Sequence, residues 1–189
     1  MSTLKFPFGI PGDGRCLFRS VVHGACLREG KSSPSESIQK ELADELRAKV
    51  VDEFIKRRQD TEWLAFFNNL FLDSHSTSIW KCLCTCIPLF HGIGNLKKFL
   101  EGDFDAYVAQ MRQPHIWGGE PELLMSSHVL QMPITVYMKD KFSGILKSIA
   151  EYGQEYGKDN PIRVLYNGCG HYDALQNPYE SQAKMYNKR

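Results

Sequence analysis

The sequence lacks a strong net charge and a long apolar run. Its 189 residues hold 23 Lys+Arg against 22 Asp+Glu, a formal net charge of +1, which provides no broad positive field for a phosphate backbone. The most apolar stretch, residues 79–90, carries Lys81 and Pro88 and is shorter than the roughly 20 apolar residues that span a membrane. We therefore expect no nucleic acid and no membrane among the partners.

Cysteine is also scarce, with six residues, which is too few for a disulfide scaffold in a chain of this size. The first ten residues contain no apolar core behind a basic cap, so we see no export signal there. We expect a reducing compartment, the cytoplasm or the nucleus, and free thiols. One of these thiols can be reactive.

The length and a 42% hydrophobic, 24% charged composition are typical of one globular domain. We assign residues 1–177 to that domain and 178–189 to a basic C-terminal tail. The oligomeric state is open, and a monomer is our expectation.

Helical patterns dominate the first part of the chain. Apolar residues predict a buried helix that begins at Cys16, directly after the Gly-rich residues 12–15. Ser33-Pro34-Ser35-Glu36 has the form of a capping box, so we expect a second helix to begin there and to end near Arg58. Its apolar residues recur every fourth position and predict one buried stripe: Ile38, Leu42, Leu46, Val50 and Phe54.

Strand patterns follow in the second part. After short helices at 103–112 and 121–130, alternation predicts strands at 134–138, 146–152, 162–166 and 171–175, the last after a turn at 167–170. Helices followed by strands predict an α+β domain, with a small sheet packed against helices.

Residues 64–99 follow neither period, and Cys, Leu and aromatic residues are dense there. Cys82, Cys84 and Cys86, with His75 and His91 nearby, invite comparison with a zinc site. Their alternate spacing lacks the second ligand pair that a structural zinc site has, so we expect no metal. Nothing else in the sequence indicates a cofactor.

A candidate nucleophile stands at the predicted helix start. A thiol attacks an acyl carbon only as thiolate, and a free Cys with pKa about 8.5 is a few per cent ionised at neutral pH. A helix N-terminus contributes roughly 0.3–1 kcal/mol, which is less than one pKa unit. Cys16 therefore needs a histidine partner as well.

Six histidines are available, and one has a suitable setting. His171 alone begins a strand after a glycine-rich turn. Residues two apart in a strand share a face, so Asp173 can accept the ring N–H and orient the imidazole. Asp13 is expected to hold the loop before Cys16 through backbone N–H groups, and free N–H groups at the helix start can form an oxyanion hole.

Three segments of the sequence are Gly12-Asp13-Gly14-Arg15-Cys16-Leu17-Phe18-Arg19-Ser20, Trp117-Gly118-Gly119-Glu120-Pro121-Glu122-Leu123 and Gly170-His171-Tyr172-Asp173. Together they resemble the motifs of the OTU (ovarian tumour domain) family of deubiquitinating cysteine proteases, and plant members are most similar. The resemblance implies a papain-like fold with a small, mostly antiparallel sheet packed between helices. It also implies hydrolysis of the isopeptide or peptide bond after the C-terminal glycine of ubiquitin, with ubiquitin or polyubiquitin conjugates as partners.

The resemblance assigns catalytic positions to Asp13, Cys16, His171 and Asp173. Residues 12, 14, 15 and 117–120 are our candidates for substrate binding: Gly12, Gly14, Arg15, Trp117, Gly118, Gly119 and Glu120. Two alternatives stay open, a catalytically impaired ubiquitin-binding module and a papain-like thiol acyltransferase.

Relative to that family, residues 64–99 look inserted. Their abrupt change of composition motivates the hypothesis that they derive from alternative splicing or an error in the gene model. We treat this segment as an atypical insertion, to which the sequence assigns no regular structure.

Overall fold

The computed structural model describes residues 6–58 and 104–176. The predicted insertion at 64–99, with its Cys82, Cys84 and Cys86, lies outside the described residues, as does the predicted tail at 178–189. The structure therefore does not test these predictions or the predicted domain limits.

Four α-helices are present in the described ranges. They are α1 (Cys16–Arg28), α2 (Glu36–Lys56), α6 (Phe104–Met111) and α7 (Glu120–Leu130), and a 3-10 turn, η3 (Gln154–Tyr156), follows later. The first helix begins at the predicted nucleophile. No described helix is long and apolar enough to cross a bilayer.

Five strands form one mixed sheet in the order β1-β5-β4-β2-β3. They are β1 (Phe6–Phe8), β2 (Ile134–Lys139), β3 (Leu146–Tyr152), β4 (Ile162–Tyr166) and β5 (Tyr172–Gln176). Three of the four pairings are antiparallel and β2 pairs with β4 in parallel, which confirms the predicted α+β class with a mostly antiparallel sheet.

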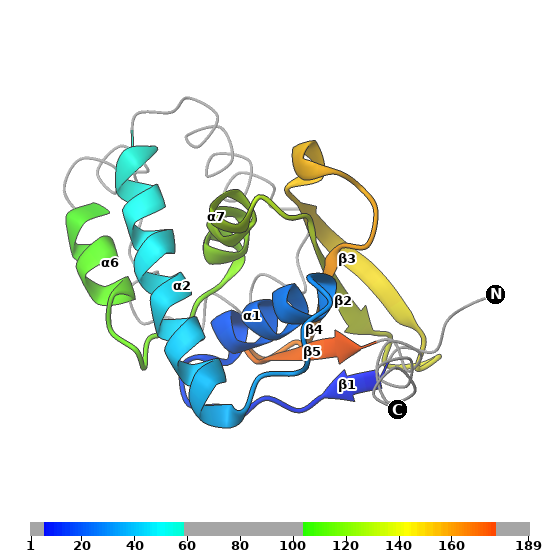
Figure 1. The fold of residues 1–189 in the computed structure, drawn as a ribbon. Coiled ribbons are helices and arrows are strands. Elements are labelled where there is room, and N and C mark those ends of the chain that lie inside the picture. Colours follow the sequence, from blue (N-terminus) through cyan, green and yellow to red (C-terminus); the bar gives the residue numbers. More distant parts are fainter. Residues whose placement is uncertain (1–5, 59–103, 177–189) are drawn as a thin grey trace, which may run out of the picture.

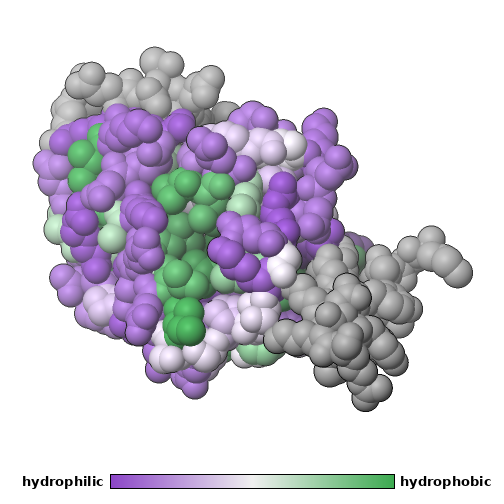
Figure 2. Space-filling model, viewed as in Figure 1, coloured by the Kyte–Doolittle hydropathy of each residue, from purple (hydrophilic) through white to green (hydrophobic). Residues whose placement is uncertain are grey.

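The helices are arranged in layers beside this sheet. Figure 1 shows α2 and α6 next to each other, with α1 and α7 between α2 and the strands. Helix α1 contacts β4 and β5, and its fully buried Phe18 and Val21 belong to the core together with Val164 and Ala174 of those strands. On the face turned to the viewer, Figure 2 shows an apolar strip between hydrophilic surfaces, over the area of α7 and α1.

The start of α2 differs from the prediction. The helix begins at Glu36 with Ser35 as its N-cap, and no side chain caps it. Ser33 therefore does not form the expected capping box, and its Oγ lies 3.4 Å from Nδ1 of the buried His23 instead. A tertiary contact with α1 thus takes the hydroxyl that the local pattern assigned to the cap.

The buried face of α2 is also rotated relative to the predicted stripe. Ile38, predicted to be buried, is 49% exposed. Arg47, a charged residue, is buried at 2% exposure, because its guanidinium finds hydrogen-bond acceptors inside the domain. The buried residues of α2 are Gln39, Ala43, Leu46, Arg47, Val50, Val51 and Phe54.

Strand β1 lies in the first ten residues, where we predicted no strand. It has three residues and contains Pro7, so the local sequence carries no strand signal. Its pairing with β5, where Phe8 stands opposite Ala174, brings the chain to the site described next.

Candidate active site

Cys16 occupies the first position of α1 and is 4% exposed. Its Sγ lies 4.0 Å from the carbonyl oxygen of Gly170, the residue that precedes His171. The structure therefore brings the two predicted segments together across 154 residues of sequence. Within residues 6–58 and 104–176, no hydrogen bond joins the thiol to the imidazole.

Burial raises the pKa of the Cys16 thiol, and the carboxylates of Asp13 and Asp173 raise it further. The backbone N–H groups of Tyr172 and Leu17 act in the opposite direction but do not compensate. The thiol is thus neutral in this arrangement, and the helix start alone does not activate it. Ionisation requires the imidazole to take the proton.

His171 and Asp173 form the predicted pair. Nε2 of His171 lies 3.1 Å from Oδ1 of Asp173, and that same oxygen accepts the backbone N–H of Ile10 at 2.9 Å. An ionised carboxylate only accepts, so the hydrogen bond assigns the ring proton to Nε2. Nδ1 is then the acceptor nitrogen, and it lies on the side of Gly12, where an added Cβ would be 3.8 Å away.

Asp13 holds the loop that leads into α1. Its Oδ1 accepts the backbone N–H of Arg15 at 3.1 Å, and its Oδ2 accepts from the buried guanidinium of Arg19 at 2.9 Å. Burial raises the pKa of Asp13, but these hydrogen bonds outweigh burial and leave the pKa below its ordinary value. The carboxylate is therefore charged. Its contact with the Arg15 N–H is of the predicted kind, and the Arg19 guanidinium is a partner that we did not predict.

The backbone of the loop before Cys16 passes close to His115 and leaves N–H groups free of acceptors among the described residues. Gly14 has φ +85°, and an added Cβ would lie 2.5 Å from the backbone of His115, so only glycine fits. Gly12 and Gly14 precede N–H groups at the start of α1. Within the described part of the chain, the N–H groups of Gly14 and Cys16 donate to no protein acceptor, which leaves them available to an oxyanion.

Trp117 lies over the turn that carries His171. It is 42% exposed, and an added Cβ on Gly170 would meet its ring at 2.8 Å. Arg15 points away from this area, because Nε and a terminal nitrogen bind both oxygens of Asp44 at 2.8 and 3.1 Å. Of these predicted substrate residues, Trp117 has a side chain at the edge of the site.

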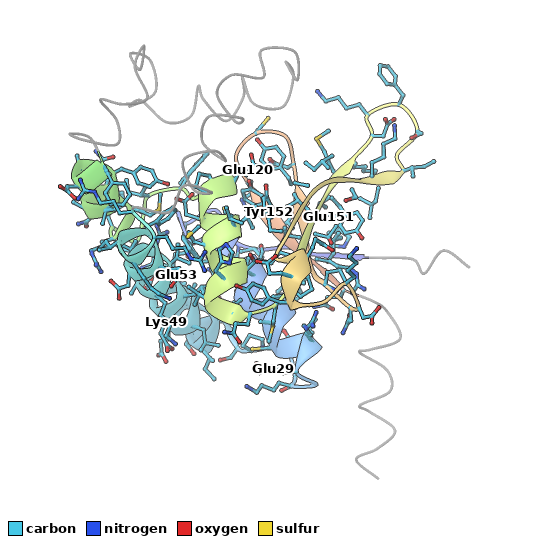
Figure 3. All side chains as sticks on the ribbon, turned by 90° about the horizontal axis from the view of Figure 1, so that it is seen from above. Glu29, Lys49, Glu53, Glu120, Glu151 and Tyr152 are labelled. Atoms are coloured by element: carbon cyan, nitrogen blue, oxygen red, sulfur yellow. The ribbon has the colours of Figure 1, made fainter. Side chains whose placement is uncertain are left out.

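The other three candidates lie deeper. Gly118 and Gly119 are buried, and the Gly119 N–H donates to Oε2 of Glu122 at 2.6 Å. Glu120 is half-buried, and the hydroxyl of Tyr152 on β3 donates to its carboxylate (Figure 3). Burial raises the pKa of Glu120 to about 7 despite this hydrogen bond. Gly119 is the N-cap of α7 and Glu120 its first residue, and contact of this segment with a substrate stays a prediction.

Comparison with known families places the chain. The family model described as OTU-like cysteine protease matches residues 11–173. The chain belongs to this family. The OTU chain is 61% identical, over 94% of its length, to ovarian tumor domain-containing deubiquitinating enzyme 4 of Arabidopsis thaliana, and it spans 44% of the length of that relative.

Solved structures agree on the fold. The viral OTU domain protease from Taggert virus matches with a TM-score of 0.56 at 16% identity, covering 92% of this chain and 80% of that chain. The Hazara virus OTU, solved bound to ubiquitin, matches with a TM-score of 0.55 at 18% identity, covering 91% and 80%. At these identities the likeness establishes the OTU fold alone.

Arg47 is a residue of this OTU site whose role the sequence did not indicate. From the middle of α2 its guanidinium donates to the carbonyls of Gly14 at 2.8 Å, Met111 at 3.1 Å and Pro114 at 3.2 Å. It also lies 4.4 Å from the centre of the Phe18 ring. Arg47 thereby joins the loop before Cys16 to the α6–α7 connection. In the sequence Arg47 is one charged residue of a regular helix pattern, so these contacts could not be predicted from it.

The described residues contain no group of three or more Cys, His, Asp or Glu side chains suited to a metal ion. Cys16, Cys26 and Cys169 are free thiols.

Proposed function

We propose that this OTU domain is a thiol-dependent deubiquitinase that cleaves the bond after the C-terminal glycine of ubiquitin. The observation that carries the proposal is the position of Cys16 at the start of α1, with Sγ 4.0 Å from the turn residue before the paired His171 and Asp173. The named function of the Arabidopsis relative and the ubiquitin-bound Hazara virus OTU support the choice of ubiquitin as substrate.

In the proposed reaction, Nδ1 of His171 takes the thiol proton of Cys16 as sulfur attacks the carbonyl carbon. Because burial keeps the free thiol neutral, proton transfer accompanies the attack. The imidazolium then gives its proton to the leaving amine, and a thioester joins ubiquitin to Cys16. Water, deprotonated by His171, hydrolyses the thioester and restores the thiol.

Asp173 is proposed to hold the Nε2–H tautomer throughout, and its second contact, the N–H of Ile10, fixes the carboxylate itself. The N–H groups of Gly14 and Cys16 are proposed to stabilise the oxyanion that forms on the substrate carbonyl. Asp13 contributes indirectly, by holding the loop that carries these N–H groups.

Hydrolysis of ubiquitin that carries a fluorescent amide at its C-terminus tests the proposal. We expect wild type to release the fluorophore, and Cys16→Ser to lose at least about a thousandfold in kcat/KM. Cys26→Ser is the matched control, because Cys26 is a half-buried free thiol on the same helix, and it should retain activity.

The same assay separates the alternatives. Saturable binding of ubiquitin without release by wild type would favour a binding module. Release that depends on an added primary amine, with the amine found joined to ubiquitin, would favour an acyltransferase.

A further inference from the structure

Ser20 lies one helical turn after Cys16 and is completely buried. Residues four apart share a face of a helix, so both side chains are turned toward the same neighbouring element. That element is β5, which runs alongside α1 (Figure 1). A serine inside a helix commonly donates its hydroxyl to the carbonyl four residues earlier. Ser20 instead donates to the carbonyl of Tyr172 on β5 at 3.0 Å, so its hydroxyl joins two elements.

Tyr172 stands between His171 and Asp173, the two members of the proposed pair. Its backbone N–H favours the thiolate and acts to lower the pKa of Cys16, and its carbonyl is the acceptor of Ser20. The N–H and C=O groups of one strand residue point to the same side of the strand. Both polar backbone groups of Tyr172 are therefore directed at α1.

The sheet holds Tyr172 from one side. The pairing of β1 with β5 ends where Phe8 stands opposite Ala174, two residues beyond Tyr172. On the other side Tyr172 pairs with Tyr166 of β4. This pairing fixes Tyr172 within the β4–β5 hairpin, but it does not fix the hairpin relative to α1.

The turn before His171 is also held from within its own hairpin. Oδ1 of Asn167 accepts the N–H of Cys169 at 2.7 Å and the N–H of His171 at 3.2 Å. The hydroxyl of Tyr166 accepts the N–H of Gly170 at 3.1 Å. These three hydrogen bonds give the turn its shape, and all of them lie within residues 166–171.

Two further polar contacts join α1 to this hairpin. One is the 4.0 Å approach of the Cys16 sulfur to the Gly170 carbonyl, which is a long and weak contact. The other joins His23 to Gln176, at the far end of β5. The Ser20 hydrogen bond lies between these two and has an ordinary length. Ser20 is 0% exposed, so water does not replace its hydroxyl at the carbonyl.

We propose that Ser20 is a positioning residue for the thiol reaction, which holds the backbone between His171 and Asp173 at a fixed place relative to Cys16. Its effect on hydrolysis rests on the proposed function. Ser20 touches neither the substrate nor the reacting atoms and acts through Tyr172. A misplacement of about 1 Å between reacting groups can cost about a hundredfold in rate, so one such hydrogen bond matters.

The test compares Ser20→Ala with Ser127→Ala. Ser127 is also 0% exposed, and its hydroxyl donates at 2.7 Å to the carbonyl of Leu124 in its own helix, α7. Each variant therefore removes one buried hydroxyl from one backbone carbonyl. For the fluorogenic ubiquitin conjugate, Ser20→Ala should lose about tenfold in kcat with KM within about twofold of wild type. Ser127→Ala should match wild type in both constants.

Alkylation of Cys16 by iodoacetamide gives a second readout that needs no ubiquitin. Mass spectrometry of the peptide that contains Cys16 follows the reaction between pH 6 and 10. At pH 7 the rate constant of Ser20→Ala should fall about three- to tenfold, because the Tyr172 N–H is no longer held at the sulfur and less thiolate forms. The difference should narrow as pH rises and both proteins ionise. Ser127→Ala should follow wild type at every pH, and so would Ser20→Ala if Ser20 served stability alone.

A second pair of variants separates the hydroxyl from the packing. Ser20→Thr and Ser20→Val have the same shape, and the threonine keeps the hydroxyl that the valine lacks. The threonine variant should exceed the valine variant about tenfold in kcat, and its Cys16 should be alkylated faster at pH 7. This comparison decides the matter if Ser20→Ala does not fold.

Wild-type kcat together with a wild-type alkylation profile in Ser20→Ala would overturn the inference, as would equal values in the threonine and valine variants. If wild type hydrolyses no ubiquitin conjugate, the proposed function fails, and the alkylation profiles alone decide whether Ser20 positions this backbone. If wild type is active and Ser20→Ala equals it in both readouts, only the inference about Ser20 fails.

Discussion

Substitution of Arg47 by methionine tests the argument about how the loop before Cys16 is held. Methionine fills much of the space of the arginine stem but removes the guanidinium. The carbonyls of Gly14, Met111 and Pro114 then lose a charged donor at 2.8, 3.1 and 3.2 Å.

The size of the effect follows from burial. Arg47 is 2% exposed, so water does not readily replace the lost donor. Leaving a buried acceptor without its donor costs about 1–3 kcal/mol of unfolding free energy, and three carbonyls lose a donor here. Burial lowers the pKa of the Arg47 guanidinium, and among the described residues its Nε has no hydrogen-bond partner. Both features reduce the stabilisation that Arg47 provides, so we expect Arg47→Met to lower the free energy of unfolding by about 3 kcal/mol.

Urea unfolding measures this loss. With a slope of about 2 kcal/mol per molar urea, the midpoint of Arg47→Met should fall by roughly 1.5 M. Arg112→Met is the control, because Arg112 is 44% exposed and pairs on the surface with Asp52 at 2.8 Å, so its midpoint should change by less than about 0.3 M. A shift in Arg47→Met no larger than in the control would refute the reasoning.

Three other substitutions give distinct readouts. Asp173→Asn should lower kcat by roughly ten- to a hundredfold, because the amide orients His171 but cannot stabilise its charged form; an unchanged kcat would contradict this. Burial lowers the pKa of His23 from 6.5 to about 4, so between these pH values the unfolded state binds up to one more proton than the folded state. The free energy of unfolding therefore decreases as the pH is lowered from 6.5 to 4. His23→Gln should remove this decline in unfolding scans at pH 4 to 6.5, and a variant curve parallel to wild type would count against it. Burial raises the pKa of Glu120 from 4.5 to about 7, so the folded state binds more protons between these pH values, and the free energy of unfolding decreases as pH rises. Glu120→Gln should flatten the dependence of the unfolding free energy on pH between 4.5 and 7. An unchanged slope in the variant would exclude Glu120 as its source.

Local patterns predicted most of the elements. Alternation gave the bounds of β3 and β4 as the structure has them, and the predicted helix at Cys16 is α1. These elements have strong local signals. The start of α2 and the strand β1 were not predicted correctly, because Ser33 and Phe6–Phe8 are positioned by contacts with distant segments.

The candidate site was predictable where its chemistry is carried by motifs. The predicted pairing of His171 with Asp173 is present, although β5 begins at Tyr172 and His171 precedes the strand instead of starting it. The roles of Arg47 and Glu122 were not predictable, because each is a charged residue in a helix whose burial depends on acceptors or donors from other elements. The raised pKa of Cys16 was likewise not predicted: burial, which the helix pattern indicated, and the carboxylates of Asp13 and Asp173 together outweigh the backbone N–H groups near the sulfur.

The most direct test of the account uses ubiquitin with a thiol-reactive electrophile in place of its C-terminal carboxylate. Incubated with the protein, it should form one covalent adduct, and mass spectrometry of the digested adduct should place it on Cys16. Cys169→Ser, which removes an exposed thiol in the turn before His171, should label like wild type, and Cys16→Ala should not label. An adduct on Cys169, or one that persists in Cys16→Ala, would contradict the assignment of Cys16 as the nucleophile.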